Sequence, residues 1–183
     1  MKNCRGIRVH ASIPPLLVGA RDMTTYDTEL IMPVAAAITG TRSTGHRELT
    51  WYAGVFSTYL APFAVKDAHF YIGGAKGIDS LTLLWLAGST SAQITVVVPC
   101  TVQDQPVEAR QAIARCRDRI AEIVELRAPE LNTSAYHTRN RWMVDHGRMV
   151  IGFPLEGGDT TSGTWQTINY GASQGKPRLI VPV

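Results

Sequence analysis

The chain has 183 residues, of which 45% are hydrophobic and 18% are charged, a composition typical of a globular domain that buries its own core. Its formal net charge is +3 without a run of lysines and arginines, which excludes a polybasic nucleic-acid tail and permits an anionic ligand. No stretch approaches the roughly 18 apolar residues of a membrane span, so we expect no membrane contact. The three cysteines show no disulfide pattern, which fits a reducing cytoplasmic location.

Residues 1–30 show weak hydrophobic periodicity, which predicts an irregular N-terminal arm. The apolar run PLLVGA is short and begins at the second of two consecutive prolines, so it does not resemble the core of a signal peptide. Met23 opens the stretch MTTYDTELIMP and offers an alternative start for the natural protein. From residue 31 to 183 the pattern predicts a single domain.

Strand and helix patterns alternate through this domain. Continuous apolar and β-branched stretches predict strands at residues 34–39, 68–73, 93–100, 121–126, 148–154 and 177–183. Apolar residues at three- and four-residue steps predict helices at residues 46–63, 79–89, 107–120, 134–147 and 162–176. The alternation predicts an α/β fold of the Rossmann-like type, with a mostly parallel sheet of about six strands and helices on both faces.

Three predicted strands are followed by loops rich in glycine, serine and threonine. These loops are TGTRSTGH, GGAKGID and PLEGGDTTSGT. Ligands of such sheets bind beyond the carboxyl ends of the strands, so the three loops should share one edge. Glycine lets a ligand approach the backbone, and helix N-termini offer unpaired N–H groups to anions. One such loop is more often a structural turn, but three on one edge favour a phosphate site.

Further candidates lie in the predicted helix 134–147. Arg139 and Asn140 could clamp a phosphate or carboxylate, whereas Arg141 and Asp145 are spaced as a surface ion pair. Asp79 could complement its helix dipole, hold a ribose hydroxyl or pair with an arginine. His46 is more often an exposed loop residue than a ligand contact. Base stacking by Trp142 and Trp165 is a further option, although core packing is the commoner fate of tryptophan.

The cysteines and histidines indicate no metal chemistry. Cys4, Cys100 and Cys116 are an odd number without a CxxC pair, which predicts neither a disulfide framework nor a zinc site. The five histidines show no HxxxH or HExxH spacing. We therefore expect no protein-built metal site and no bound cofactor.

The motifs AAAITGTRSTG, YIGGAKGID, HTRNRWMVD and SGTWQTINYGASQGKPRLIVPV carry a resemblance to a known family. Over about residues 34–183 the chain resembles the Rossmann-like domain of the DNA-processing protein A (DprA/Smf) and SLOG superfamily, which includes LOG- and YpsA-like domains. The ligand edge that the resemblance implies consists of Gly40, Thr41, Arg42, Gly73, Gly74, Ala75, Gly77, Asp79, Arg139, Asn140, Ser162, Gly163 and Thr164.

Members of this superfamily bind single-stranded DNA, bind nucleotides or their derivatives, or cleave nucleotides as phosphoribohydrolases. Our main prediction is a sensor, carrier or sequestering module for a phosphate-bearing nucleotide, with Arg42 and Arg139 neutralising the phosphate. The alternative is single-stranded DNA binding of the DNA-processing protein A type, which predicts a strong salt dependence.

The third prediction is hydrolysis of an N-glycosidic bond. The hydrolases resemble a pattern PGGxGTxxE, but Thr167 stands here in place of the glutamate. Glu156 or Asp159 would have to supply the carboxylate, so we favour binding over catalysis. Aromatic residues in the predicted helix 46–63 favour a homodimer or higher homo-oligomer.

Overall fold

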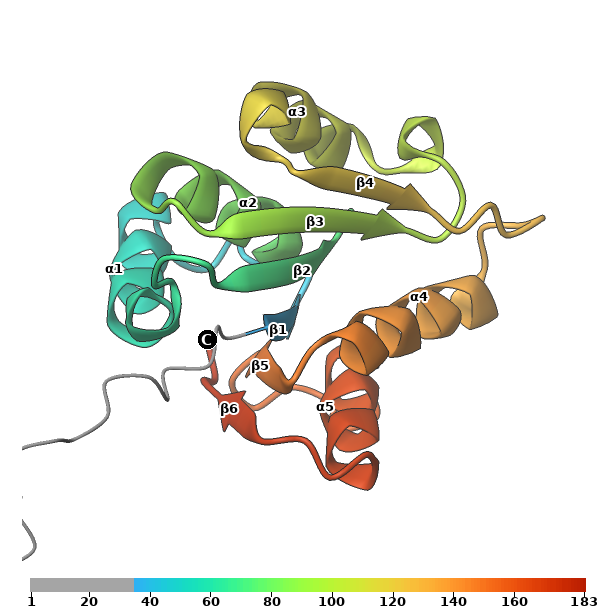
Figure 1. The fold of residues 1–183 in the computed structure, drawn as a ribbon. Coiled ribbons are helices and arrows are strands. Elements are labelled where there is room, and N and C mark those ends of the chain that lie inside the picture. The colour runs from blue at the N-terminus through green and yellow to red at the C-terminus, as the bar shows by residue number, and fades with distance from the viewer. Residues whose placement is uncertain (1–34) are drawn as a thin grey trace, which may run out of the picture. The chain divides into compact units, whose positions relative to one another are not determined.

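A computed structural model describes residues 35–183, so the predicted N-terminal arm and Cys4 lie outside the described residues. Six strands form one sheet in the order β4-β3-β2-β1-β5-β6, and all neighbouring pairs are parallel (Figure 1). The strands are β1 (Ala35–Gly40), β2 (His69–Gly73), β3 (Gln93–Val98), β4 (Glu122–Glu125), β5 (Met149–Phe153) and β6 (Arg178–Ile180).

Helices cover both faces of the sheet, because the central strands are apolar on both sides. The helices are α1 (Leu49–Tyr59), α2 (Ile78–Ser89), α3 (Val107–Arg115), α4 (Thr133–His146) and α5 (Gly163–Ser173). Along β1, Ala36 and Ile38 belong to the larger core, and Ala37 belongs to the smaller core together with Met143 and Ile168. This alternation follows the two-residue period of a strand and places α4 and α5 together on one face.

The fold class predicted from the sequence is confirmed, and the predicted strands and helices match within a few residues at most ends. The helix predicted over 46–63 is shorter, since α1 ends at Tyr59 and Pro62 falls in the separate 3₁₀ turn η2 (Ala61–Phe63). Proline lacks the N–H that would continue the α-helix. Leu49, at the first position of α1, is 70% exposed although it is apolar.

The helix predicted over 107–120 is likewise interrupted. It ends at Arg115 and is followed by the 3₁₀ turn η4 (Arg117–Arg119) before β4. A further 3₁₀ turn, η3 (Val102–Asp104), precedes α3.

Among the described residues, no helix has the length and apolar character needed to cross a membrane.

The order of the strands reverses next to β1. The chain passes from β1 through β2 and β3 to β4 in one direction, then returns to place β5 on the other side of β1. The register pairs Gly40 with Phe153 at the carboxyl ends of these two strands. Such a reversal leaves a crevice beyond the strand ends, where α/β proteins bind their ligands.

Candidate functional site at the reversal of strand order

A cleft of about 510 Å³ lies at this reversal, and we call it the switch-point cleft. Its volume falls in the range of about 300–1,000 Å³ that is usual for ligand pockets. The predicted residues that line it are Gly40, Thr41, Arg42, Ala75, Asp79, Arg139, Asn140, Asp159, Ser162, Gly163 and Thr164. The predicted residues outside the lining are Gly73, Gly74, Gly77 and Glu156.

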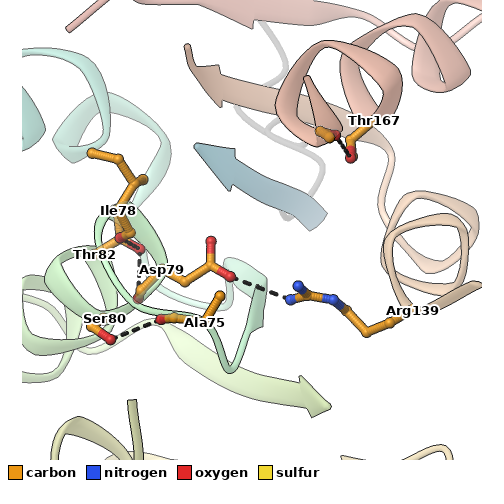
Figure 2. Close-up of polar contacts among 8 residues, drawn as sticks. Ala75, Ile78, Asp79, Ser80, Thr82, Arg139 and Thr167 are labelled. Atoms are coloured by element: carbon orange, nitrogen blue, oxygen red, sulfur yellow. Dashed lines mark hydrogen bonds and ion pairs between the residues drawn. The ribbon is translucent and has the colours of Figure 1, made fainter. Parts of the chain in front are cut away.

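A buried ion pair forms one wall of the cleft. Asp79 comes from the first turn of α2 and Arg139 from the middle of α4, and their side chains point toward one another (Figure 2). Nη1 of Arg139 donates to Oδ2 of Asp79 at 3.3 Å, and the two residues are only 4% and 6% exposed. Of the three roles considered for Asp79, the structure contains the pairing with an arginine and the position in the first turn of α2 that complements the helix dipole.

The pair does not saturate the guanidinium. Arg139 Nε is buried and has no hydrogen-bond partner. A guanidinium carries five N–H donors, and an unpaired buried donor costs about 1–3 kcal/mol. Burial raises the pKa of Asp79, and the charge of Arg139 only partly opposes this effect.

The glycines of the turn 73–77 do not line the cleft, because the chain itself approaches them. A Cβ atom at Gly73 would overlap Nη1 of Arg139, and one at Gly77 would lie 2.6 Å from the carbonyl oxygen of Thr41. Gly77 also has a φ of 78°, which favours glycine. Its N–H donates to Oε1 of Glu108 at 2.9 Å, so this amide is already paired within the protein.

The loop after β1 is held in place from both sides. The N–H of Thr41 donates to the carbonyl of Phe153 at 2.9 Å, and the carbonyl of Thr41 accepts from the N–H of Ile78 at 3.0 Å. The next residue, Arg42, is exposed and places its guanidinium 4.5 Å from the ring centre of Tyr136. The ring centre of Tyr136 also lies 5.9 Å from the guanidinium carbon of Arg139, so the tyrosine lies close to both cations.

The N-terminus of α5 also borders the cleft. Ser162 is the N-cap, but its side chain makes no hydrogen bond to the first turn. Gly163 and Thr164, the first two helical residues, line the cleft. The free N–H groups and the helix dipole make this end of α5 attractive to an anion.

The carboxylate of Asp159 is engaged within its own loop. The N–H and the hydroxyl of Thr161 donate to Asp159 at 2.7 and 2.5 Å, and these bonds lower the pKa of Asp159. Thr167, in place of the hydrolases' glutamate, is buried and donates to the carbonyl of Gly163 at 2.7 Å (Figure 2). Two carboxylates were considered for hydrolysis, Glu156 and Asp159. Only Asp159 is part of the cleft lining.

Several other candidates lie elsewhere. The ring of Trp142 stacks on that of His146 at a centroid distance of 3.6 Å, and Trp142 and Trp165 both pack against the smaller core. Neither tryptophan lines the cleft, and neither does His46. The predicted surface ion pair of Arg141 with Asp145 is wrong, because Asp145 instead accepts from the hydroxyl of Tyr170 at 2.9 Å.

Residues 35–183 contain no group of three or more histidine, cysteine, aspartate or glutamate side chains that could hold a metal ion. Cys100 and Cys116, the two cysteines in this range, are buried free thiols. Burial is the main cause that raises the pKa of each thiol, which favours the protonated form.

Sequence reasoning missed part of the lining. The additional residues are Ile38, Thr39, Thr133, Tyr136, His137, Met143, Leu155, Gly158, Thr161 and Gln166. Tyr136 and Met143 precede and follow Arg139 by three and four residues on α4. Residues three or four positions apart lie on the same face of a helix. Including the residues one turn before and one turn after Arg139 would therefore have predicted both.

Comparison with known proteins identifies the fold. No family model matches the sequence, and no curated protein matches it. DNA processing protein A from Helicobacter pylori, in a structure that describes its single-stranded DNA binding mode, matches with a TM-score of 0.62 and 20% sequence identity. The match covers 82% of this chain and 66% of that chain, so this chain spans about two thirds of its neighbour's length. The chain thus has the fold of DNA processing protein A.

Proposed function

We propose that the protein binds single-stranded DNA and holds one nucleotide unit in the switch-point cleft. The observation that carries this proposal is the incompletely paired Arg139 in the wall of the cleft. Its guanidinium is buried and bonded to Asp79 through Nη1, while Nε has no partner. Guanidinium groups bind phosphate through two parallel N–H donors, so a phosphate oxygen is a suitable partner for the unused donors.

Two further groups support a phosphate ligand. The first turn of α5 presents Gly163 and Thr164 to the same cleft, and Ser162 does not cap their N–H groups. Arg42 is exposed at the rim and adds a second positive charge. A helix N-terminus and two arginines together favour an anion more strongly than any one of them does.

The shared fold supports DNA over other phosphate ligands. The neighbour with this fold is a protein whose single-stranded DNA binding mode has been described. Single-stranded DNA also needs only a few cations and an apolar or aromatic surface for its bases. Tyr136, which lies between Arg42 and Arg139 at the cleft, supplies such a surface.

A free nucleotide or nucleotide derivative is the second candidate, and the size and charge of the protein favour it. The cleft of about 510 Å³ is large enough for one small ligand, and the net charge of +3 is modest for a DNA-binding protein. In this case the protein would act as a sensor, carrier or sequestering module.

Fluorescence anisotropy with a labelled oligothymidylate of about 20 nucleotides tests the main proposal. We expect binding at about 50 mM salt that weakens as salt is raised, because bound phosphates release counterions. Arg42→Ala should weaken binding about tenfold, since it removes one charge-assisted contact. Arg117→Ala is the matched control, because Arg117 is an exposed arginine of η4 outside the cleft lining, and it should bind within about twofold of wild type.

Mass spectrometry of small molecules released by denaturing the purified protein tests the second candidate. A nucleotide released from wild type but not from Arg42→Ala, without oligonucleotide binding at low salt, would replace the main proposal with the second. Oligonucleotide binding that Arg42→Ala and Arg117→Ala reduce equally would place the DNA outside the cleft and contradict the main proposal.

A further inference from the structure

A narrow groove between α4 and α5 adjoins the switch-point cleft, and we call it the α4–α5 groove. It is lined by His137, Asn140 and Arg141 from α4 and by Gln166, Thr167 and Tyr170 from α5. His137, Asn140 and Gln166 line both spaces, so the groove continues directly from the cleft. Its volume is about 80 Å³, much smaller than the 510 Å³ of the cleft.

Arg141 lines this groove and forms no ion pair within 4.0 Å in residues 35–183. Its guanidinium carbon lies 5.6 Å from the ring centre of Tyr170, a cation–π contact that orients the side chain. Arg141 takes no part in the ion pair of Arg139 with Asp79. The nearby acid Asp145 accepts from the hydroxyl of Tyr170 and does not line the groove.

We propose that the α4–α5 groove is the path by which a DNA strand leaves the cleft, with Arg141 binding the phosphate of the neighbouring nucleotide. This inference rests on the proposed function. A strand held in the cleft by one nucleotide must leave it along the surface, and the groove is continuous with the cleft. Its small volume suits the narrow sugar–phosphate backbone, while the wider base stays outside.

The polar lining matches that ligand. The side chains of His137, Asn140 and Gln166 supply hydrogen-bonding groups at the junction of cleft and groove, where phosphate and sugar oxygens would lie.

The dependence of affinity on ligand length tests the path. The full chain is titrated with a labelled oligothymidylate of about 12 nucleotides, and unlabelled thymidine monophosphate serves as a competitor that reaches only the cleft. We expect Arg141→Ala to weaken oligonucleotide binding about five- to tenfold and to reduce the slope of log K against log salt by about 0.7, the loss of one phosphate contact. The inhibition constant of the mononucleotide should stay within about twofold.

Two variants make the result specific. Arg141→Lys should recover most of the salt slope because it retains the charge, and Arg117→Ala should match wild type. If Arg141→Ala binds like Arg117→Ala while Arg42→Ala binds weakly, the strand takes another path, and the proposed function stands without this inference. Equal losses for mononucleotide and oligonucleotide would place the action of Arg141 inside the cleft and overturn the path. A wild-type protein that binds no oligonucleotide overturns both proposals.

Discussion

Two glycine-rich segments at the same edge of the sheet look alike in the sequence but have different surroundings. The turn 73–77 is buried except for Lys76, and other parts of the chain occupy the space beside its glycines. The loop 154–162 between β5 and α5 is mostly exposed, and at its end Gly163 has no atom within 4 Å of the position where a Cβ would be.

This difference shows what a glycine pattern does and does not predict. Glycine indicates that something approaches the backbone closely, but the approaching group can be the protein itself. At Gly73 that group is the guanidinium of Arg139, whereas around Gly163 the space remains open. The same substitution at the two positions should therefore have opposite consequences.

Gly73→Ala should have the largest effect. The new methyl group would occupy the position of Nη1 of Arg139, so the guanidinium must move and its bond to Asp79 must break. Breaking a buried ion pair costs about 3–5 kcal/mol of the free energy of unfolding. Urea denaturation of wild type and variant measures this difference. A loss below about 1 kcal/mol would mean that Arg139 finds another position at little cost, and the buried pair would then not explain Gly73.

Asp79→Asn should have a smaller effect, because the amide keeps the shape and one acceptor oxygen for Arg139. We expect a loss near neutral pH that is smaller than the roughly 1.5–3 kcal/mol of a hydrogen bond to a charged group, because the amide oxygen still accepts from Arg139. Denaturation near pH 7 gives the number. Asp79→Leu is the matched control, because it removes the acceptor and should destabilise the protein further.

The pH dependence of stability gives a second measurement on Asp79. Its pKa is raised in the folded protein, so the folded state binds more protons than the unfolded state between the two pKa values. The contribution of Asp79 to stability is thus fully present below the unfolded pKa and decreases as pH rises through the folded pKa. Asp79→Asn should lack this decrease; an unchanged profile would contradict the raised pKa.

The sequence predicted the fold more completely than the site, and particular residues show why. Alternation of apolar strands with amphipathic helices is a local pattern, so the β-strands and their parallel arrangement could be predicted from it. The pairing of Asp79 with Arg139 joins residues 60 positions apart and depends on how the sheet positions α2 and α4 relative to one another. Local patterns carry no such information, so Arg139 was predicted as a ligand clamp without its buried partner.

Gly163→Ala should not destabilise the fold and should weaken binding instead. The position has no close neighbour and lies in the first turn of α5. Alanine should therefore stabilise the fold by up to about 1 kcal/mol, because it lowers the conformational entropy of the unfolded chain. A methyl group on the cleft lining should weaken oligonucleotide binding about threefold or more. Denaturation and anisotropy on the same preparation measure both. Destabilisation comparable to that of Gly73→Ala would remove the distinction between the two glycine-rich segments.

Thr161→Val should have the smallest effect and should appear only in the titration of Asp159. The substitution removes the hydroxyl that donates to Oδ2 at 2.5 Å but keeps the backbone N–H that donates to Oδ1 at 2.7 Å. Since these bonds lower the pKa of Asp159, losing one should raise that pKa partway toward its ordinary value. The stabilisation of the loop by Asp159 is present above the unfolded pKa and disappears as pH falls through the folded pKa, so in the variant it should disappear at a higher pH. Carbon-detected NMR titration of the carboxyl group measures the shift, with Thr160→Val as the control. If both variants titrate like wild type, the exposed loop does not hold Asp159 in the geometry described, and its carboxylate would be free to turn into the cleft.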